Sequence, residues 1–290
     1  MKKKNWSLLT ILMVTTLNVG FVSCDDDDDN GAEGSPSPTA GVIDKSSGLR
    51  LKSFGDFTVY YKDGGLIDYV EGESYNAKLI FSYKPNKIIY STDDGIAETW
   101  IVSYNNNGWI STCDINDTYN NGNYATTNIE KTKFSYDGDG HLISVSTSGN
   151  YIEIEDGEKY SEKFTRQTTL TWKDGLLMKR ISEDKYDDGG ETITYTYNYQ
   201  KEYANKYKQW CTIDRDVMSQ YYILYHLGLL GIGPDKLPSS VIEKYSDIDE
   251  NGKVIYNNNE TWPLSYQFNK DGSISCCTLG SSNYQYSYQH

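Results

Sequence analysis

The chain has 290 residues, a formal net charge of −14 and 27 tyrosines against seven phenylalanines. Nucleic acids and anionic membrane surfaces attract basic proteins, so this acidic balance argues against both as partners. Tyrosine suits half-buried strand positions, because its ring is apolar while its hydroxyl stays hydrated. The composition therefore favours a β-rich architecture.

The N-terminus carries a positively charged segment, an apolar segment and a cysteine, in that order. Lysines occupy positions 2–4, the apolar run covers Leu8–Val22, and Ser23 precedes Cys24. The apolar run is short for a membrane span. Residues 1–24 resemble a bacterial lipoprotein signal, with Phe21 where leucine is usual. This resemblance implies removal of residues 1–23 and acylation of Cys24, which would anchor the protein in the outer membrane. An uncleaved helix is the alternative.

The segment from Cys24 to residue 48 is predicted to be a flexible tether. Five aspartates follow Cys24 directly, and glycine, proline and serine dominate the remainder. The acidic run resembles the export signal of surface lipoproteins of Bacteroidota, which implies a location facing the cell exterior. Residues 49–290 remain, and they are numerous enough for one domain with a real core.

One hairpin phrase recurs along residues 49–290. It consists of alternating apolar and polar residues with an aromatic, then a turn rich in Asp, Asn and Gly, then aliphatic residues. The copies cover residues 59–67, 81–89, 102–110, 134–143, 170–177 and 266–274. We predict a mainly β domain with about 12–16 antiparallel strands in a single up-and-down sheet, curled into a barrel or half-barrel. The second strand face is rich in Thr, Ser, Gln, Lys and Glu, so we expect no membrane-spanning barrel.

One helix interrupts this pattern near residues 214–230. Asp214 or Asp216 can cap its start, while Gly228 and Pro234 favour its end. Apolar residues cover almost its whole circumference, so we expect it to be buried against the curled sheet. A plug in the core is the preferred interpretation, and a movable lid over a ligand cavity is the alternative. The main apolar stripe comprises Met218, Tyr221, Tyr222, Tyr225 and Leu229.

The ordered set of hairpins, the helix segment 218–224 and the following segment 237–245 are similar to a known family. It comprises tethered lipoproteins of Bacteroidota with a porin-like domain of unknown function, and the similarity covers residues 50–290. The hairpins also resemble a degenerate form of the tyrosine–aspartate repeat of large bacterial shell proteins. The resemblance implies a curled antiparallel sheet with an inserted helical stretch and no catalytic residues.

Candidate metal and disulfide sites are few. Asp247, Asp249 and Asn251 match the first half of a calcium loop, whereas a hairpin turn is the alternative. We expect no other metal and no cofactor. Four cysteines follow the lipid-bearing one, and a disulfide among them is open, although buried thiols are the preferred interpretation. They are Cys113, Cys211, Cys276 and Cys277.

Aromatic residues are the candidate ligand-binding groups. Trp210 and Trp262 could stack on a sugar, although ordinary burial is the preferred interpretation for both. Tyr221 and Tyr225, which lie on the predicted helix, are further candidates. Carboxylates spaced as Glu153 and Glu155 occur by chance in an acidic chain, and the usual hydrolase and phosphate-binding motifs are missing, so we predict no enzyme.

The sequence thus predicts a non-catalytic cell-envelope lipoprotein. It would be a surface binding or scaffold module for a glycan or a protein. The alternative is a carrier for an apolar ligand, held in a half-barrel cavity beneath a helical lid at residues 217–230. The oligomeric state stays open.

Overall fold

The computed structural model describes residues 41–44, 47–72, 77–83, 86–91, 97–120, 124–201, 203–210 and 221–290. Cys24, Cys211 and the predicted signal and tether up to residue 40 lie outside these ranges. The elements are β1 (Val42–Asp44), β2 (Leu49–Phe54), β3 (Phe57–Tyr61), β4 (Ile67–Gly72), β5 (Lys78–Tyr83), β6 (Asn86–Ser91), β7 (Ala97–Tyr104), β8 (Ile110–Asn120), β9 (Tyr124–Tyr136), β10 (Leu142–Glu155), β11 (Glu158–Lys173), β12 (Leu176–Tyr186), β13 (Gly189–Asn198), β14 (Tyr203–Ala204), α1 (Tyr222–His226), β15 (Lys236–Leu237), β16 (Ser240–Asp249), β17 (Val254–Phe268), β18 (Ile274–Leu279) and β19 (Ser282–Gln289).

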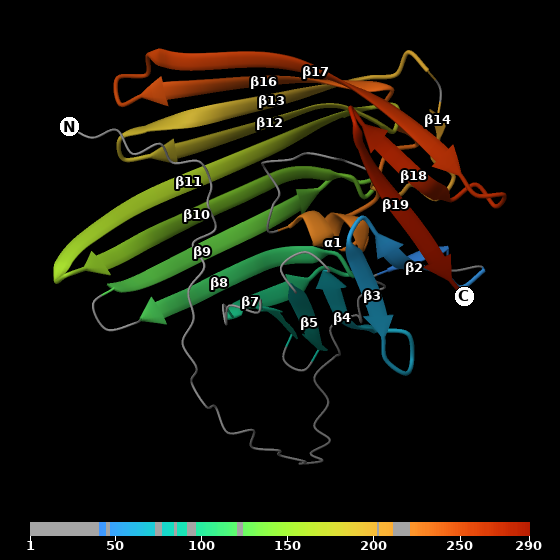
Figure 1. Cartoon of the computed structure of the whole chain (residues 1–290), viewed down its shortest axis with the longest axis horizontal. Coiled ribbons are helices and arrows are strands. Elements are labelled where there is room, and N and C mark those ends of the chain that lie inside the picture. The colour runs from blue at the N-terminus through green and yellow to red at the C-terminus, as the bar shows by residue number, and fades with distance from the viewer. Residues whose placement is uncertain are drawn as a thin grey trace.

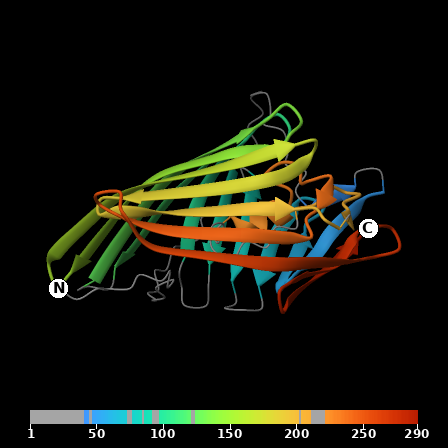
Figure 2. The same cartoon turned by 90° about the horizontal axis from the view of Figure 1, so that it is seen from above.

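Sixteen of these strands form one closed antiparallel barrel (Figures 1 and 2). Strands β2 to β13 pair in chain order, β13 pairs with β16 across an insertion, and β16 to β19 again pair in order. The pairing of β19 with β2 closes the ring. The fold class predicted from the sequence is confirmed, with the barrel as the realised option. Closure leaves these sixteen strands without an unpaired edge.

Five tight turns of the barrel share one hydrogen-bonding pattern. In each, a glycine amide donates to the carbonyl oxygen three residues earlier, at 2.9–3.3 Å. The glycines have φ between 77° and 90°, where a Cβ atom would be strained. The Asn-Gly and Asp-Gly signals in the sequence therefore mark positions where the backbone needs glycine. These glycines are Gly65, Gly108, Gly140, Gly252 and Gly272.

The strands differ in length around the ring, and this difference divides the barrel. Strands β3 to β7 have five to eight residues, whereas β9, β10, β11 and β17 have 13 to 16. The long hairpins project beyond the rest, and α1 lies inside the ring toward the other end (Figure 1). We call the interior around α1 the plug end and the inner face of the long hairpins the long-strand end.

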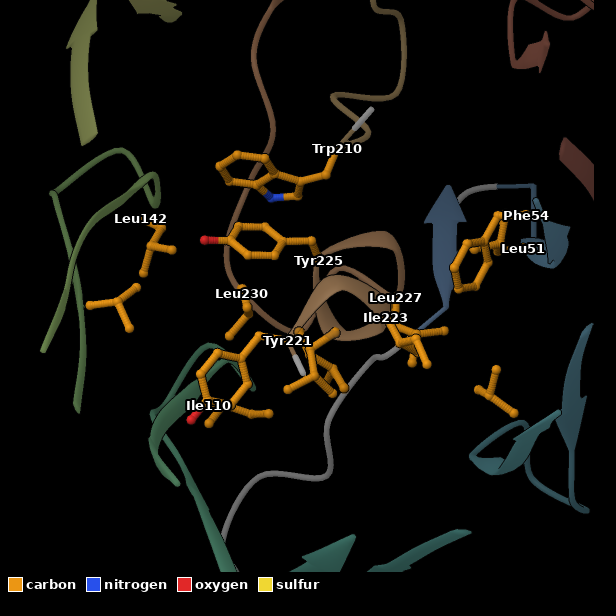
Figure 3. Close-up of a cluster of buried hydrophobic side chains, with 14 of the residues drawn as sticks. Leu51, Phe54, Ile110, Leu142, Trp210, Tyr221, Ile223, Tyr225, Leu227 and Leu230 are labelled. Carbon is orange, nitrogen blue, oxygen red and sulfur yellow. The ribbon is translucent and has the colours of Figure 1, made fainter. Parts of the chain in front are cut away.

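The plug end contains the hydrophobic core. Leu224, Leu227 and Leu230 are at most 1% exposed and pack against side chains from strands all around the barrel. Figure 3 shows plug side chains pointing outward from α1 toward Leu142 and Ile110 on one side and toward Phe54 on the other. The predicted core plug is thus present over the described residues 221–230.

The helix itself is shorter than the predicted span of 214–230. It ends at His226, and residues 211–220 lie outside the described ranges. Beyond it, the carbonyl oxygens of Leu227 and Leu229 accept the amides of Gly41, next to β1, and of Ile110 on the barrel strand β8. These carbonyl oxygens are therefore satisfied by other parts of the chain, and no further helical turn is needed. This explains why the apolar residues extend past the end of the helix.

The outer face of the barrel carries charged residues together with exposed apolar ones such as Ile80, Ile101 and Ile129. Exposed outward positions include Asp114 on β8, Lys131 and Lys133 on β9, and Lys163 on β11. A barrel that spans a bilayer needs a continuous apolar outer band, and the expectation that this barrel does not span a membrane stays a prediction. Within the described ranges, α1 is too short to cross a membrane, and so is every other helical turn.

Candidate functional site: the inner face of the long-strand end

The aromatic residues predicted from the sequence lie mainly in the plug. The indole nitrogen of Trp210 donates to the carbonyl oxygen of Gly231 at 3.0 Å, and its ring meets Tyr225 edge-on at 4.8 Å. The Tyr221 ring packs edge-on against Phe134 at 5.4 Å. Trp210, Tyr221 and Tyr225 are 3–4% exposed. A ligand could reach them only if the plug moved, and their proposed role in binding stays a prediction.

Trp262 on β17 also faces the core and is half-buried against it. Within the described residues, the sequence-predicted aromatics therefore gather around packed side chains rather than in an exposed row. Cys24 lies outside the described ranges, so its acylation stays a prediction as well.

The candidate calcium residues form a turn between β16 and β17. Asp249 Oδ1 accepts the amides of Asn251 and Lys253 at 3.0 and 2.9 Å, and Asp247 lies on β16 opposite Tyr256. Asn105 and Asp137 cap their own hairpin turns through the same two bonds. The hairpin alternative explains this segment without an ion, because the carboxylate already satisfies the turn's amides.

One group in the described residues brings metal-ligating atoms together, and it is another hairpin turn. The ligand atoms of Asp137, Asp139 and His141 lie within 4.8 Å of one another. His141 Nδ1 is 3.1 Å from Asp137 Oδ2, and the imidazole stacks on Trp172 at 4.2 Å. The turn amides and His141 hold the pKa of Asp137 below its usual range despite the opposing effect of burial. Both Asp137 oxygens are thus engaged inside the turn.

The described cysteines are buried, and no disulfide joins them. Burial raises the pKa of the Cys113 thiol to about 12, so this thiol stays protonated and unreactive at neutral pH. Pairing with Cys211 lies outside the described residues.

Polar side chains replace the apolar core where the interior passes from the plug to the long-strand end. Thr132 Oγ1 lies 2.9 Å from Thr147 Oγ1 and 2.9 Å from the Tyr221 hydroxyl. The Thr168 and Ser182 hydroxyls are 2.6 Å apart. All of these side chains are buried. They form a hydrogen-bonded layer at the inner boundary of the plug.

Beyond this layer, three carboxylates oppose one another directly on adjacent strands. Asp184 on β12 faces Glu191 on β13, and Glu191 faces Asp247 on β16. We call Asp184, Glu191 and Asp247 the carboxylate row. Arg166 and Tyr256 are the next cross-strand partners at its two ends. Each of these carboxylates lies an even number of residues from a buried residue on its own strand: Ser182, Ile193 or Val241. Since alternate residues of a strand point to the same side, the row lies on the inner face of the barrel.

Only one end of the carboxylate row is neutralised by an ion pair among the described residues. Arg166 Nε is 2.7 Å from Asp184 Oδ2, and the Tyr186 hydroxyl is 3.3 Å from the same oxygen. The Tyr245 hydroxyl donates to Glu191 at 2.9 Å. The pKa of Glu191 lies above its usual value: burial and the charges of Asp184 and Asp247 raise it, whereas the Tyr245 hydrogen bond and the charge of Arg166 lower it. The row is electrostatically unfavourable in itself, because opposed like charges on a sheet repel.

A second acidic group faces the interior from β7 to β9. It comprises Glu98, Asp117 and Glu130, on strands whose inner face also carries buried Trp100 and Ile115. The pKa of Glu98 lies above its usual value. Burial and the neighbouring charges of Asp117 and Glu130 raise it, whereas the hydrogen bond from the Trp100 indole lowers it. The inner face of the long-strand end is therefore acidic on two sides.

This inner surface was not predicted from the sequence, although the sequence contains a signal for it. On β12, Arg180, Ser182 and Asp184 occupy the alternate positions that carry apolar core residues on other strands. A strand whose two faces are both polar cannot lie wholly over an apolar core. Alternation reveals this feature, but it does not show that separate strands align their carboxylates.

The chain is similar in structure to several solved proteins. No known family matches the chain, and no curated protein matches it. A porin-like protein from Bacteroides uniformis has 16% sequence identity and a TM-score of 0.49, over 80% of this chain and 89% of that chain. A similarity this low cannot transfer a function.

Proposed function

We propose that the protein is a non-catalytic binding module of the bacterial cell envelope, anchored through a lipid on Cys24. Its ligand binds on the inner face of the long-strand end, at the carboxylate row and its tyrosines. One observation carries this proposal: carboxylates and phenols occupy an inner face that elsewhere forms the core, and Glu191 and Asp247 are only half-buried. Polar groups in such a place cost stability and are retained where binding requires them.

The apolar-carrier alternative has less support. It needs a roomy cavity under the helix, whereas Leu224, Leu227 and Leu229 are at most 1% exposed and belong to the packed core. The catalytic alternative has less support too. Glu155 lies opposite Glu158 at the exposed tip of the β10–β11 hairpin, away from the buried interior.

The full-length protein in detergent should be tested against a glycan array and a panel of small polar ligands. Lipids co-extracted with it should be identified by mass spectrometry. We expect a polar ligand whose affinity falls when Glu191 is replaced by Gln, and no stoichiometric lipid. Stoichiometric lipid bound at the plug, without any polar ligand, would favour the carrier.

The anchor and location need their own experiment, because they are independent of the ligand. Metabolic labelling with a fatty acid should mark the wild-type protein and leave Cys24→Ala unlabelled. A protease added to intact cells should cleave the protein if it faces the exterior. Protection in intact cells together with cleavage in lysed cells would place it on the periplasmic side.

A further inference from the structure

The carboxylate row contains an acceptor that the described protein does not satisfy. Asp184 has a side chain 6% exposed, and its Oδ2 takes both bonds described above. Its Oδ1 is buried without a hydrogen-bond partner in the described ranges. An unsatisfied buried polar atom destabilises the fold, and more strongly when the group is charged. The outer face of β12 is the barrel surface, so a donor reaching this oxygen must come from the interior.

The charges beside this oxygen select a positively charged ligand. Glu191 and Asp247 continue the row beyond Asp184. Among the described residues, Arg166 is the cation that forms an ion pair with the row, through Asp184. An anionic ligand would be repelled by three opposed carboxylates. A cation would both relieve their mutual repulsion and provide the missing donor.

The spacing of the row favours an organic cation over a single metal ion. Calcium binds six to eight oxygens at about 2.3–2.6 Å, which requires carboxylates gathered around one point. Within the described residues, the ligand atoms that lie within 4.8 Å of one another belong to the Asp137 turn, not to this row. The row has one carboxylate on each of three neighbouring strands. This arrangement instead suits a ligand whose N–H donors are separated from one another.

Tyrosine rings beside the row suit the same class of ligand. Tyr245 and Tyr256 have ring centroids 5.8 Å apart at the Asp247 end of the row. Ammonium and guanidinium groups bind favourably over such rings. The protein makes this contact itself nearby, where the Arg180 guanidinium lies 4.5 Å above the centre of the Tyr195 ring.

We propose that the carboxylate row, with Tyr245 and Tyr256, binds a small organic cation that carries amine or guanidinium groups. This inference rests on the proposed function and adds the chemical class of its ligand. Recognition requires ionised carboxylates, and it should weaken as salt screens the more exposed charges.

Spermidine is a suitable probe, and isothermal titration calorimetry of the full-length protein in detergent measures its binding. Glu191→Gln and Asp247→Asn keep the size of each side chain and remove one charge. Glu183→Gln is the matched control, because Glu183 lies one residue from Asp184 on the exposed face of β12. We expect saturable binding, about tenfold weaker in each row variant and unchanged in the control.

Two outcomes would overturn the proposal. One is an equal loss of affinity in Glu183→Gln and Glu191→Gln, which would indicate nonspecific attraction to an acidic surface. The other is the absence of spermidine binding at about 1 mM. If glycans then bind in a manner that depends on Glu191, the proposed function stands and only the ligand class is wrong. If neither glycans nor spermidine bind, the proposed function fails as well.

Discussion

The two ends of the barrel use the same kind of strand for opposite purposes. At the plug end, inward residues are apolar and meet the helix and the segment after it, as in the contact of Leu224 with the surrounding core. At the long-strand end, the same inward phase carries Asp184, Glu191 and Asp247. The alternation of a strand therefore specifies which residues face inward, whereas the opposing element decides whether that face becomes an apolar core or a polar surface.

The largest effect should come from truncating the plug. Leu224 is fully buried, so Leu224→Ala should lower the free energy of unfolding by about 2–5 kcal/mol, through lost burial and the cavity left behind. Urea denaturation followed by tyrosine and tryptophan fluorescence measures this. Ile255→Ala is the control, since Ile255 is 60% exposed and should change stability by less than about 0.5 kcal/mol. Equal effects would contradict the assignment of the plug as core.

A buried histidine should make the plug sensitive to acid. His226 lies in an aromatic cage, stacked on Phe54 at 4.6 Å and edge-on to Tyr222, and neither ring nitrogen has a hydrogen-bond partner in the described part of the chain. Burial lowers the pKa of His226 to about 3, against about 6.5 when unfolded. Between these values the unfolded imidazole binds a proton that the folded one does not, so stability should fall as pH drops from about 6.5.

His226→Phe tests this directly, because phenylalanine can keep the stacking on Phe54. We expect about 1–3 kcal/mol of added stability at pH 7, from removal of two unsatisfied buried nitrogens. The fall in stability between pH 6.5 and pH 4 should also be shallower. Denaturation midpoints across this pH range decide the matter, and an unchanged pH dependence would show that His226 is not the titrating group.

Removing a hydroxyl from the polar layer between the two ends should lower the stability of the protein moderately. Thr132→Val keeps the shape of the side chain and removes the hydroxyl that contacts Thr147 and Tyr221. We expect a loss of about 1–2 kcal/mol, because two buried hydroxyls each lose a partner. Thr169→Val, on the exposed face of β11, should be nearly neutral in the same urea experiment. If both variants behave alike, the polar layer does not couple the plug to the wall.

The smallest stability effect, and the one of opposite sign, is expected in the carboxylate row. Asp247→Asn removes one of three opposed charges and should stabilise the protein by about 0.2–1 kcal/mol at low salt. The gain should shrink when salt is added, because Asp247 is only half-buried. Thermal unfolding at two salt concentrations measures it. A clear loss of stability would mean that the row contributes to folding rather than opposing it.

Much of the fold was predictable because its signals are local. The alternation of apolar and polar residues predicted which side chains of each strand face inward. The turn glycines marked the hairpins, because a positive φ is a property of a few neighbouring residues. The apolar segment around Tyr221–Leu230 predicted a buried insertion. The end of the helix at His226 was not predictable, because it depends on barrel amides such as that of Ile110.

For the candidate site, the sequence predicted which strands carry polar residues but not how these residues are arranged. The sequence by itself determined that β12, β13 and β16 carry polar residues on both faces, and that glycines end the hairpins. Only the tertiary structure decided that Asp247 stands in one row with Asp184 and Glu191, and that Trp210 packs in the plug. The reason is that residues separated by 56 or more positions, such as Glu191 and Asp247, meet through cross-strand register. Barrel closure sets that register over the whole ring, beyond the reach of any local pattern.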